Sequence, residues 1–116
     1  MKHILIVEDN PLNLIYVEII LKKNGYTFDS VDNGEDAYEY FKNNTYDTIL
    51  MDIKLPIMDG ITCTKLIRQY EKDIMMIKPV EIIAVTAVAT ELLLSDIFDK
   101  VIIKPFLFGD LLEALK

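Results

Sequence analysis

Residues 49–60 read ILMDIKLPIMDG, an apolar run that stops at Asp52 and is followed by a loop of turn-forming residues. The three residues before Asp52 are apolar without alternation, which favours a strand covered on both faces, as in a parallel sheet between helices. Asp52 then stands at the carboxyl end of that strand. Ligands bind at this edge of open α/β sheets, but a single Asp also serves turns and caps. Its function therefore depends on which other residues reach the same edge.

Strand-like and helix-like segments alternate outward from this stretch along the whole chain. Strands joined by helices through short connections imply right-handed crossovers. The sequence therefore predicts an α/β fold with a doubly wound, five-stranded parallel sheet, in which strand 27–31 lies nearer an edge because polar residues interrupt it. The expected strands are residues 3–7, 27–31, 47–51, 80–86 and 101–103, and the expected helices are residues 11–24, 35–43, 59–71, 89–97 and 107–115.

The first expected helix has clear boundaries. Asn10 suits an N-cap with Pro11 at the first helical position, and Gly25 ends the helix. Further along, Asn33-Gly34 predicts a turn. Apolar residues at helical spacing give the first helix a wide face that we expect to lie against the sheet. They are Leu14, Ile15, Val17 (or Glu18 in its place), Ile19, Ile20 and Leu21.

Length and composition limit the classes of protein that this chain can represent. A chain of 116 residues, of which 52% are hydrophobic, fits one domain spanning residues 1–116 with a sizeable core. Its net charge of −7 argues against a sequence-independent grip on nucleic acid, which needs a concentrated basic surface. Its apolar runs are too short for insertion into a membrane, and the first residues turn acidic too early for a secretory signal.

Cys63 is the only cysteine, so the chain can form no internal disulfide. We expect it to be a small buried residue rather than a nucleophile. A reducing, cytoplasmic location follows as the default expectation.

The predicted topology gathers polar residues from distant parts of the chain at one edge of the sheet. The carboxyl ends of the first, third, fourth and fifth strands carry Glu8-Asp9, Asp52, Thr86 and Lys104. Each has an ordinary explanation on its own, such as a helix cap or a solvated surface charge. Together, three clustered carboxylates repel one another and require a cation. Hard oxygen ligands with open positions suit Mg²⁺, which also binds phosphate oxygens.

Four motifs at these strand ends carry a resemblance to a known family. They are LIVEDN at residues 5–10, LMDIKLPIMDG at residues 50–60, AVTA at residues 84–87 and IIKPF at residues 102–106. With these motifs the chain resembles the receiver domain of two-component response regulators, including the chemotaxis receivers, over essentially its whole length. The resemblance implies a flavodoxin-like (βα)5 fold with strand order 2-1-3-4-5.

The resemblance implies a role for each residue at this edge. Asp52 would be the phosphoacceptor that attacks the phosphoryl group of a phosphohistidine on a sensor histidine kinase or a His-phosphotransfer protein. Lys104 would neutralise one phosphoryl oxygen, and Thr86 would hydrogen-bond another. Phosphorylation adds negative charge and acceptor oxygens, so the output of this phosphorelay step would be a changed surface rather than the product of an enzyme.

The same resemblance implies Mg²⁺ as the cofactor of the domain. Asp9 and Asp52 would bind the ion directly, with the backbone carbonyl of Lys54 as a third ligand. Glu8 would act through a metal-bound water. The peptide bond before Pro105 would be cis, as is usual in the family.

Two departures from the family pattern bear on the switch. Val101 stands where the family usually has Tyr or Phe, so a readout based on rotation of an aromatic ring does not carry over. The interval from Thr86 to Lys104 is shorter than usual by about one helical turn, roughly four residues, so the helix at 89–97 should be short or irregular. Its three leucines at 92–94 either pack more deeply or join Val101 and the start of the last helix in a docking surface for a partner protein or a second copy.

Two other functions remain open from the sequence. A pseudo-receiver would keep the fold as a constitutive interaction module without being phosphorylated, although every expected acid, hydroxyl and amine is present. A metal-dependent phosphatase on a similar sheet would normally carry a second acid two residues after its nucleophilic Asp, where this chain has Lys54. We therefore favour phosphotransfer signalling, either by a stand-alone regulator or by a receiver excised from a larger protein.

Overall fold

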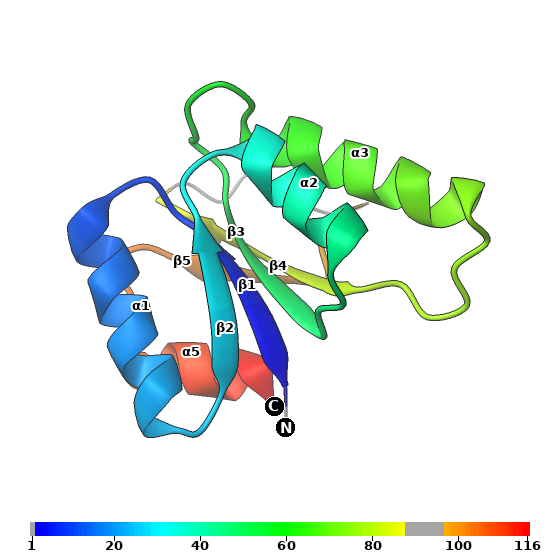
Figure 1. Ribbon diagram of the computed structural model, residues 1–116. Helices are drawn as coiled ribbons and strands as arrows, with labels where there is room; N and C mark the ends of the chain where they lie inside the picture. Colours follow the sequence, from blue (N-terminus) through cyan, green and yellow to red (C-terminus); the bar gives the residue numbers. More distant parts are fainter. Residues whose placement is uncertain (1, 88–96) are drawn as a thin grey trace.

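A computed structural model describes residues 2–87 and 97–116 and contains a five-stranded parallel sheet (Figure 1). The strand order is β2-β1-β3-β4-β5, and every neighbouring pair is parallel. This order confirms the doubly wound, flavodoxin-like sheet and the edge position of β2. The strands are β1 (His3–Val7), β2 (Thr27–Val31), β3 (Thr48–Asp52), β4 (Glu81–Thr86) and β5 (Lys100–Ile103).

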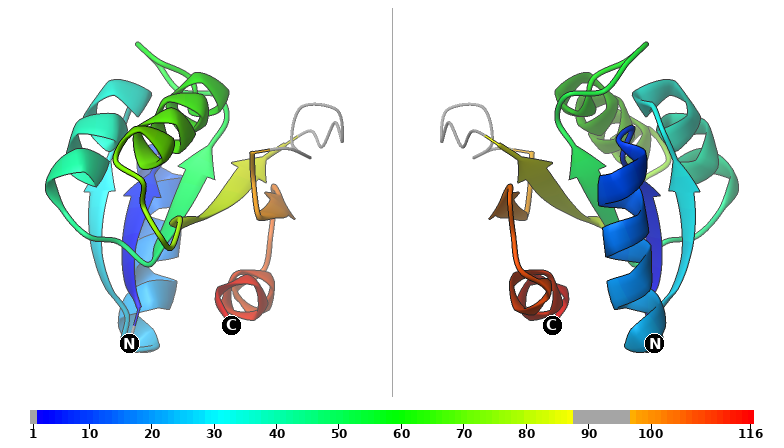
Figure 2. Two further views of the ribbon diagram at one scale, coloured as in Figure 1. Left: turned by 90° about the vertical axis from the view of Figure 1, so that its right-hand side faces the viewer. Right: turned by 90° about the vertical axis from the view of Figure 1, so that its left-hand side faces the viewer.

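Four helices in the described residues cover the two faces of the sheet. They are α1 (Pro11–Lys23), α2 (Gly34–Asn43), α3 (Gly60–Asp73) and α5 (Phe108–Leu115). α1 and α5 pack on one face and α2 and α3 on the other, and both views in Figure 2 show α5 across the strands from α3. The helix expected over 89–97, with its leucines at 92–94, lies outside the described residues apart from Ile97. None of the described helices combines the length and apolar character needed to cross a membrane.

The sheet lies between two apolar layers, which explains the unbroken apolar runs of its central strands. Successive residues of β1 and β3 point alternately into the two layers, so both strands are buried on both faces. Cys63 of α3 is fully buried in one layer, as expected for a structural cysteine. Burial raises the pKa of its thiol to about 12, so the thiol stays protonated at neutral pH.

Side-chain caps determine where three of the helices begin. Asn10 Oδ1 accepts hydrogen bonds from backbone N–H groups in the first turn of α1, and Asp59 does the same at the start of α3. At the start of α2, Asn33 Oδ1 accepts from the Asp36 N–H at 2.8 Å. The Asn33-Gly34 pair is therefore a helix start, where the sequence predicts a turn.

The expectation that Ile15 and Ile19 of α1 lie against the sheet is wrong. Each side chain is 51% exposed, whereas Val17, Ile20 and Leu21 are buried. A helix on a sheet buries one stripe of its surface, but α1 carries apolar residues around most of its circumference. Apolar spacing therefore identifies the helix without showing which side of it is buried.

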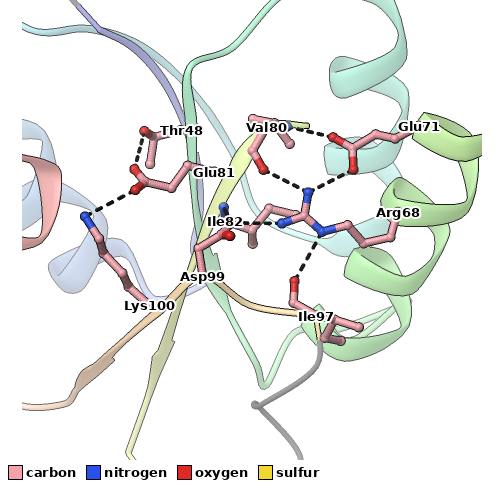
Figure 3. A network of polar contacts seen from close by, with 9 residues as sticks. All are labelled: Thr48, Arg68, Glu71, Val80, Glu81, Ile82, Ile97, Asp99 and Lys100. Atoms are coloured by element: carbon pink, nitrogen blue, oxygen red, sulfur yellow. Dashed lines mark hydrogen bonds and ion pairs between the residues drawn. The ribbon is translucent and has the colours of Figure 1, made fainter. Parts of the chain in front are cut away.

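A polar network joins α3 to the amino ends of β4 and β5 (Figure 3). Arg68 Nη1 donates to Glu71 Oε1 and to the Val80 carbonyl, both at 2.8 Å, and Arg68 Nη2 donates to Asp99 Oδ2 at 2.9 Å. Arg68 Nε donates to the Ile97 carbonyl at 3.2 Å. Glu71 and Asp99 also accept hydrogen bonds from backbone N–H groups at the start of β4. Every nitrogen of the guanidinium is therefore used within the chain, as expected of a network that stabilises the fold.

Candidate functional site

The carboxyl ends of β1 and β3 bring three carboxyl groups together. Glu8 and Asp9 follow β1 directly, and Asp52 is the last residue of β3, the neighbouring strand. One oxygen from each of these side chains lies within 4.8 Å of the others. Glu8 and Asp52 are buried, whereas Asp9 is exposed. The three acids therefore form one cluster that reaches solvent through Asp9.

Lys104 extends into this cluster from just beyond the end of β5. Its Nζ lies 2.9 Å from Glu8 Oε1 and 3.0 Å from Asp52 Oδ2. The backbone N–H of Lys104 donates to the Thr86 carbonyl at 2.8 Å, which ties Lys104 to the end of β4. Thr86 is buried there, one residue beyond Val85, the β4 partner of Asp52. Asp52, Thr86 and Lys104 therefore stand at the ends of three adjacent strands.

The charges at this edge do not balance. Burial raises the pKa of Glu8 to about 7, the hydrogen bond and charge of Asp52 act in the same direction, and Lys104 opposes them. Burial alone would lower the pKa of Lys104, but its hydrogen bonds to Glu8 and Asp52, with their charges, raise it overall. Glu8 and Asp52 therefore share one ammonium that stays protonated at neutral pH, and Asp9 adds a third carboxyl group to the cluster. This surplus of oxygen ligands favours the binding of a divalent cation.

Two glycines bring the loop after β3 close to the site. The Gly60 N–H donates to the Ile53 carbonyl at 2.9 Å, and a Cβ at Gly60 would overlap the Asp52 carbonyl oxygen. The Gly34 N–H donates to the Met58 carbonyl at 3.0 Å, and a Cβ at Gly34 would overlap that oxygen. Both α2 and α3 therefore begin against the backbone that surrounds Asp52. This role of Gly34 was not predicted from the sequence. A glycine at the start of a helix was the feature that could have indicated a close approach of another backbone segment.

The remaining residues singled out in the sequence lie around this cluster. Lys54 is exposed in the loop, two residues beyond Asp52, and its carbonyl as a metal ligand stays a prediction. The Lys104–Pro105 peptide bond is cis, as expected. Val101 lies on β5 opposite Ala84 and is 41% exposed.

Comparison with known proteins shows which family has this fold and this cluster. The family model of the response regulator receiver domain matches residues 4–116. The chain is a response regulator receiver domain. This receiver domain is 44% identical over 89 residues to part of hybrid signal transduction histidine kinase M of Dictyostelium discoideum, and the match covers 75% of this chain and 4% of that protein. The chain spans less than a tenth of the length of each of the curated relatives it matches first.

Two solved receiver domains are similar over nearly the whole chain. The receiver domain of a Pseudomonas aeruginosa sensor histidine kinase, crystallised with a magnesium ion in its active-site cleft, is 35% identical with a TM-score of 0.86, covering 98% of this chain and 93% of that one. The receiver domain of Ssk1 from Saccharomyces cerevisiae, crystallised with the histidine phosphotransfer protein Ypd1, is 28% identical with a TM-score of 0.91. The match covers 97% of this chain and 85% of that one. The acid cluster of this receiver domain has the ligand type that such a metal requires.

Proposed function

We propose that this receiver domain accepts a phosphoryl group on Asp52 from the phosphohistidine of a sensor histidine kinase or a His-phosphotransfer protein. One observation carries the proposal: the buried Asp52 carboxylate lies 3.0 Å from Lys104 Nζ and within a cluster of two further acids. The family match over residues 4–116 supports treating the chain as a single receiver domain. A cytoplasmic location, expected from its lone cysteine, belongs to the same proposal.

The proposed transfer is a single displacement at phosphorus. Because Lys104 Nζ holds Asp52 Oδ2, we assign the attack to Asp52 Oδ1. The new P–O bond forms as the P–N bond to the donor imidazole breaks, and the imidazole nitrogen keeps that electron pair. Lys104 then neutralises one phosphoryl oxygen, and the Thr86 hydroxyl donates a hydrogen bond to another. Such a transfer depends mainly on positioning and charge, which these residues provide.

Mg²⁺ fits this edge because the three acids offer hard oxygen ligands within 4.8 Å of one another. We assign Asp9 and Asp52 as direct ligands, together with the backbone carbonyl of Lys54, and Glu8 as a ligand through water. The ion would supply positive charge that stabilises the transferring phosphoryl group. The magnesium ion in the cleft of the Pseudomonas relative supports this assignment.

The proposed output is a change of surface rather than the release of a product by an enzyme. An aspartyl phosphate carries about −1.5 to −2 charge where the carboxylate carried −1, at a buried edge that already has surplus acid, so Thr86 and its surroundings would rearrange. Thr86 pairs with Ile103 of β5, and both Ile103 and Val101 are partly exposed on that strand. The change would reach a downstream protein or a second copy through this face, and self-catalysed loss of the phosphoryl group would end it.

The upstream partner would dock beside the acid cluster. Leu12 and Ile15 of α1 are 78% and 51% exposed, and they follow Asp9 within about one turn of helix. Exposed apolar side chains of this size give a protein partner a surface to cover. The complex of the Ssk1 receiver domain with Ypd1 supports a His-phosphotransfer protein in this role.

Phosphoryl uptake from acetyl phosphate, followed by intact mass, tests the proposal. The wild type should gain one phosphoryl group with Mg²⁺ and none with EDTA, and Asp52→Asn should gain none in either case. Glu113→Ala is the matched control, because that carboxylate is exposed on α5 and should not affect uptake. An adduct that persists in Asp52→Asn would overturn the assignment of Asp52. Absence of any adduct in a folded wild type would favour the pseudo-receiver.

A further inference from the structure

The loop between α3 and β4 lies at the amino edge of the sheet (Figure 1). It carries a group of exposed apolar side chains. Met75 is 86% exposed, Ile77 is 99% exposed and Ile74 is 49% exposed. We call residues 74–79 the amino-edge ridge. Large apolar side chains that gather on one exposed loop mark an interaction surface, unlike apolar residues scattered singly.

The ridge also contains an unfavourable backbone conformation. α1 and α3 end in the same motif, in which the two residues after the C-cap donate hydrogen bonds to carbonyls of the last turn. This motif needs a positive φ at the first of those residues, which glycine adopts most readily. α1 has Gly25 there, with φ 78°, but α3 has Met75, with φ 54°. Residues with a Cβ are disfavoured in this conformation.

The Met75 side chain makes little contact within its own chain that would offset this unfavourable conformation. Because the side chain is almost fully exposed, it gains little packing inside its own chain. The backbone hydrogen bonds of the motif need no side chain, as Gly25 shows at the end of α1. The hydrogen bonds of the motif would favour glycine at this position equally, so an exposed methionine there points to a contact outside the chain.

A hollow of about 620 Å³ lies on the same edge, and ridge residues 76, 78 and 79 form part of its wall, whereas the exposed Ile74, Met75 and Ile77 do not line it. Its apolar lining includes Phe41, Tyr46, Met76 and Pro79. Because exposed apolar side chains and a hollow share one surface, a two-fold axis can bring Met75 and Ile77 of each copy to the hollow of the other.

Charge favours a second copy as the occupant of this surface. Across the whole chain 19 acidic residues exceed 12 basic ones, so two copies repel each other over most of their surfaces. Residues 72–81 and the residues that line the hollow instead carry three charged residues of each sign, so the net charge of −7 comes from the rest of the chain. These six residues are Lys2, Lys72, Lys78, Asp47, Asp73 and Glu81.

We propose that the amino-edge ridge is a self-association surface through which two copies of this domain form a two-fold dimer. Asp52 lies at the opposite edge of the sheet, so the acid cluster of each copy stays accessible. The proposal is independent of the phosphoacceptor function. It also names a different surface from the β5 face, which carries Val101.

Analytical ultracentrifugation from low micromolar to millimolar protein tests the dimer. The wild type should shift from monomer to dimer as its concentration rises. Ile77→Asp should stay monomeric, because the two-fold axis would bury a carboxylate in each half of the interface. Met75→Leu keeps an apolar side chain and should dimerise, whereas Met75→Gly should weaken association at least about tenfold.

Thermal unfolding of Met75→Gly separates an interaction role from a structural one. At a low micromolar concentration, where both proteins are monomeric, the midpoint should stay unchanged or rise by up to about 4 °C, because glycine suits a positive φ. A lower midpoint would show that the Met75 side chain stabilises its own chain, and would overturn the proposal.

Val101→Asp is the control for the rival face and should dimerise like the wild type. A wild type that stays monomeric throughout would overturn the proposal. So would a dimer that survives Ile77→Asp but is lost in Val101→Asp. Phosphoryl uptake by Met75→Gly should equal that of the wild type, so a general failure of uptake would count against the phosphoacceptor function alone.

Discussion

The charged side chains at the two edges of this parallel sheet differ in how their hydrogen bonds and charges are satisfied within the chain. At the carboxyl edge, three carboxyl groups cluster together, and two of them, those of Glu8 and Asp52, share the ammonium of Lys104. At the amino edge, Arg68 lies between Glu71 and Asp99, and each of its nitrogens donates to an acceptor of the same chain (Figure 3). The cation of the amino-edge network has every nitrogen bound within the chain, whereas the carboxyl edge gathers three carboxyl oxygens within 4.8 Å of one another.

This difference separates groups that hold the fold from groups that await a ligand. Removing one partner of a buried, fully hydrogen-bonded ion pair leaves the other charge unpaired, which lowers the free energy of unfolding. Two acids also outnumber one cation at the amino edge, but Glu71 and Asp99 accept further hydrogen bonds from backbone N–H groups. At the carboxyl edge three carboxyl oxygens converge within 4.8 Å of one another, which gives that cluster the capacity to bind a metal ion. Changes at the amino edge should therefore affect stability, and changes at the carboxyl edge should affect chemistry.

Replacing Arg68 with Met should have the largest effect on stability. The substitution leaves buried Glu71 without its cation, so the free energy of unfolding should fall by about 3–5 kcal/mol, measured by urea denaturation. Lys116→Met, which removes an exposed ion pair with Glu113, should be indistinguishable from the wild type. Folded Arg68→Met should still take up phosphoryl groups at the wild-type rate, and a slower rate would show that the two edges are not separable.

Replacing Lys104 with Met should instead act on chemistry. The rate of phosphoryl uptake should fall by about 10²-fold, because the transferring group loses a preorganised positive charge. Mg²⁺ affinity, measured by calorimetry, should be kept or increase, since a competing cation has been removed. Lys100→Met removes a lysine that pairs with Glu81 at the amino edge, and its uptake rate should be normal. Equal losses in both variants would contradict the comparison.

Replacing Gly34 with Ala should disturb the carboxyl edge through the backbone. The added Cβ would overlap the Met58 carbonyl, so the loop after β3 must move. We expect a loss of about 1–3 kcal/mol in unfolding free energy together with weaker Mg²⁺ binding. Gly109→Ala in α5 is the matched control, because a Cβ there meets nothing within 4 Å and should stabilise the helix by up to about 1 kcal/mol.

The pH dependence of stability should have opposite signs at the two edges. The folded-state pKa of Glu8 is raised from 4.5 to about 7, so its contribution is fully present below pH 4.5 and is lost as pH rises towards 7. Burial alone would raise the pKa of Glu81, but hydrogen bonds from Thr48 and Lys100 lower it, so its contribution is lost as pH falls. Thermal midpoints measured from pH 4 to 8 should therefore respond oppositely to Glu8→Gln and Glu81→Gln. The same response in both variants would refute the contrast.

The cluster of polar residues at the carboxyl edge could be predicted from the sequence because the apolar runs allow few other arrangements of the strands. Continuous apolar runs in β1 and β3 predict strands covered on both faces, and parallel topology then forces their carboxyl ends to one edge. Residues as distant as Glu8, Asp52 and Lys104 meet there for that reason.

The sequence did not predict the features that depend on exposure or on long side chains. Apolar spacing in α1 could not show that Ile15 and Ile19 face solvent. The partners of Arg68 include Val80 and Asp99, which are 12 and 31 positions away along the chain, and no local pattern links them. The amino-edge ridge depends on a positive φ at a methionine, and local propensity argues against that conformation.

Arg68 also holds two points of the chain that lie far apart in sequence. Its guanidinium binds the carbonyl of Val80, just before β4, and that of Ile97, just before β5. The backbone carbonyls of Val80 and Ile97 are therefore held at the same guanidinium group. Insertions or deletions after β4 and before Ile97 fall within the span that Arg68 closes, and a change in the length of such a connection costs little free energy. Arg68 would thus let this stretch diverge in length during evolution, which suits the shortened interval between Thr86 and Lys104.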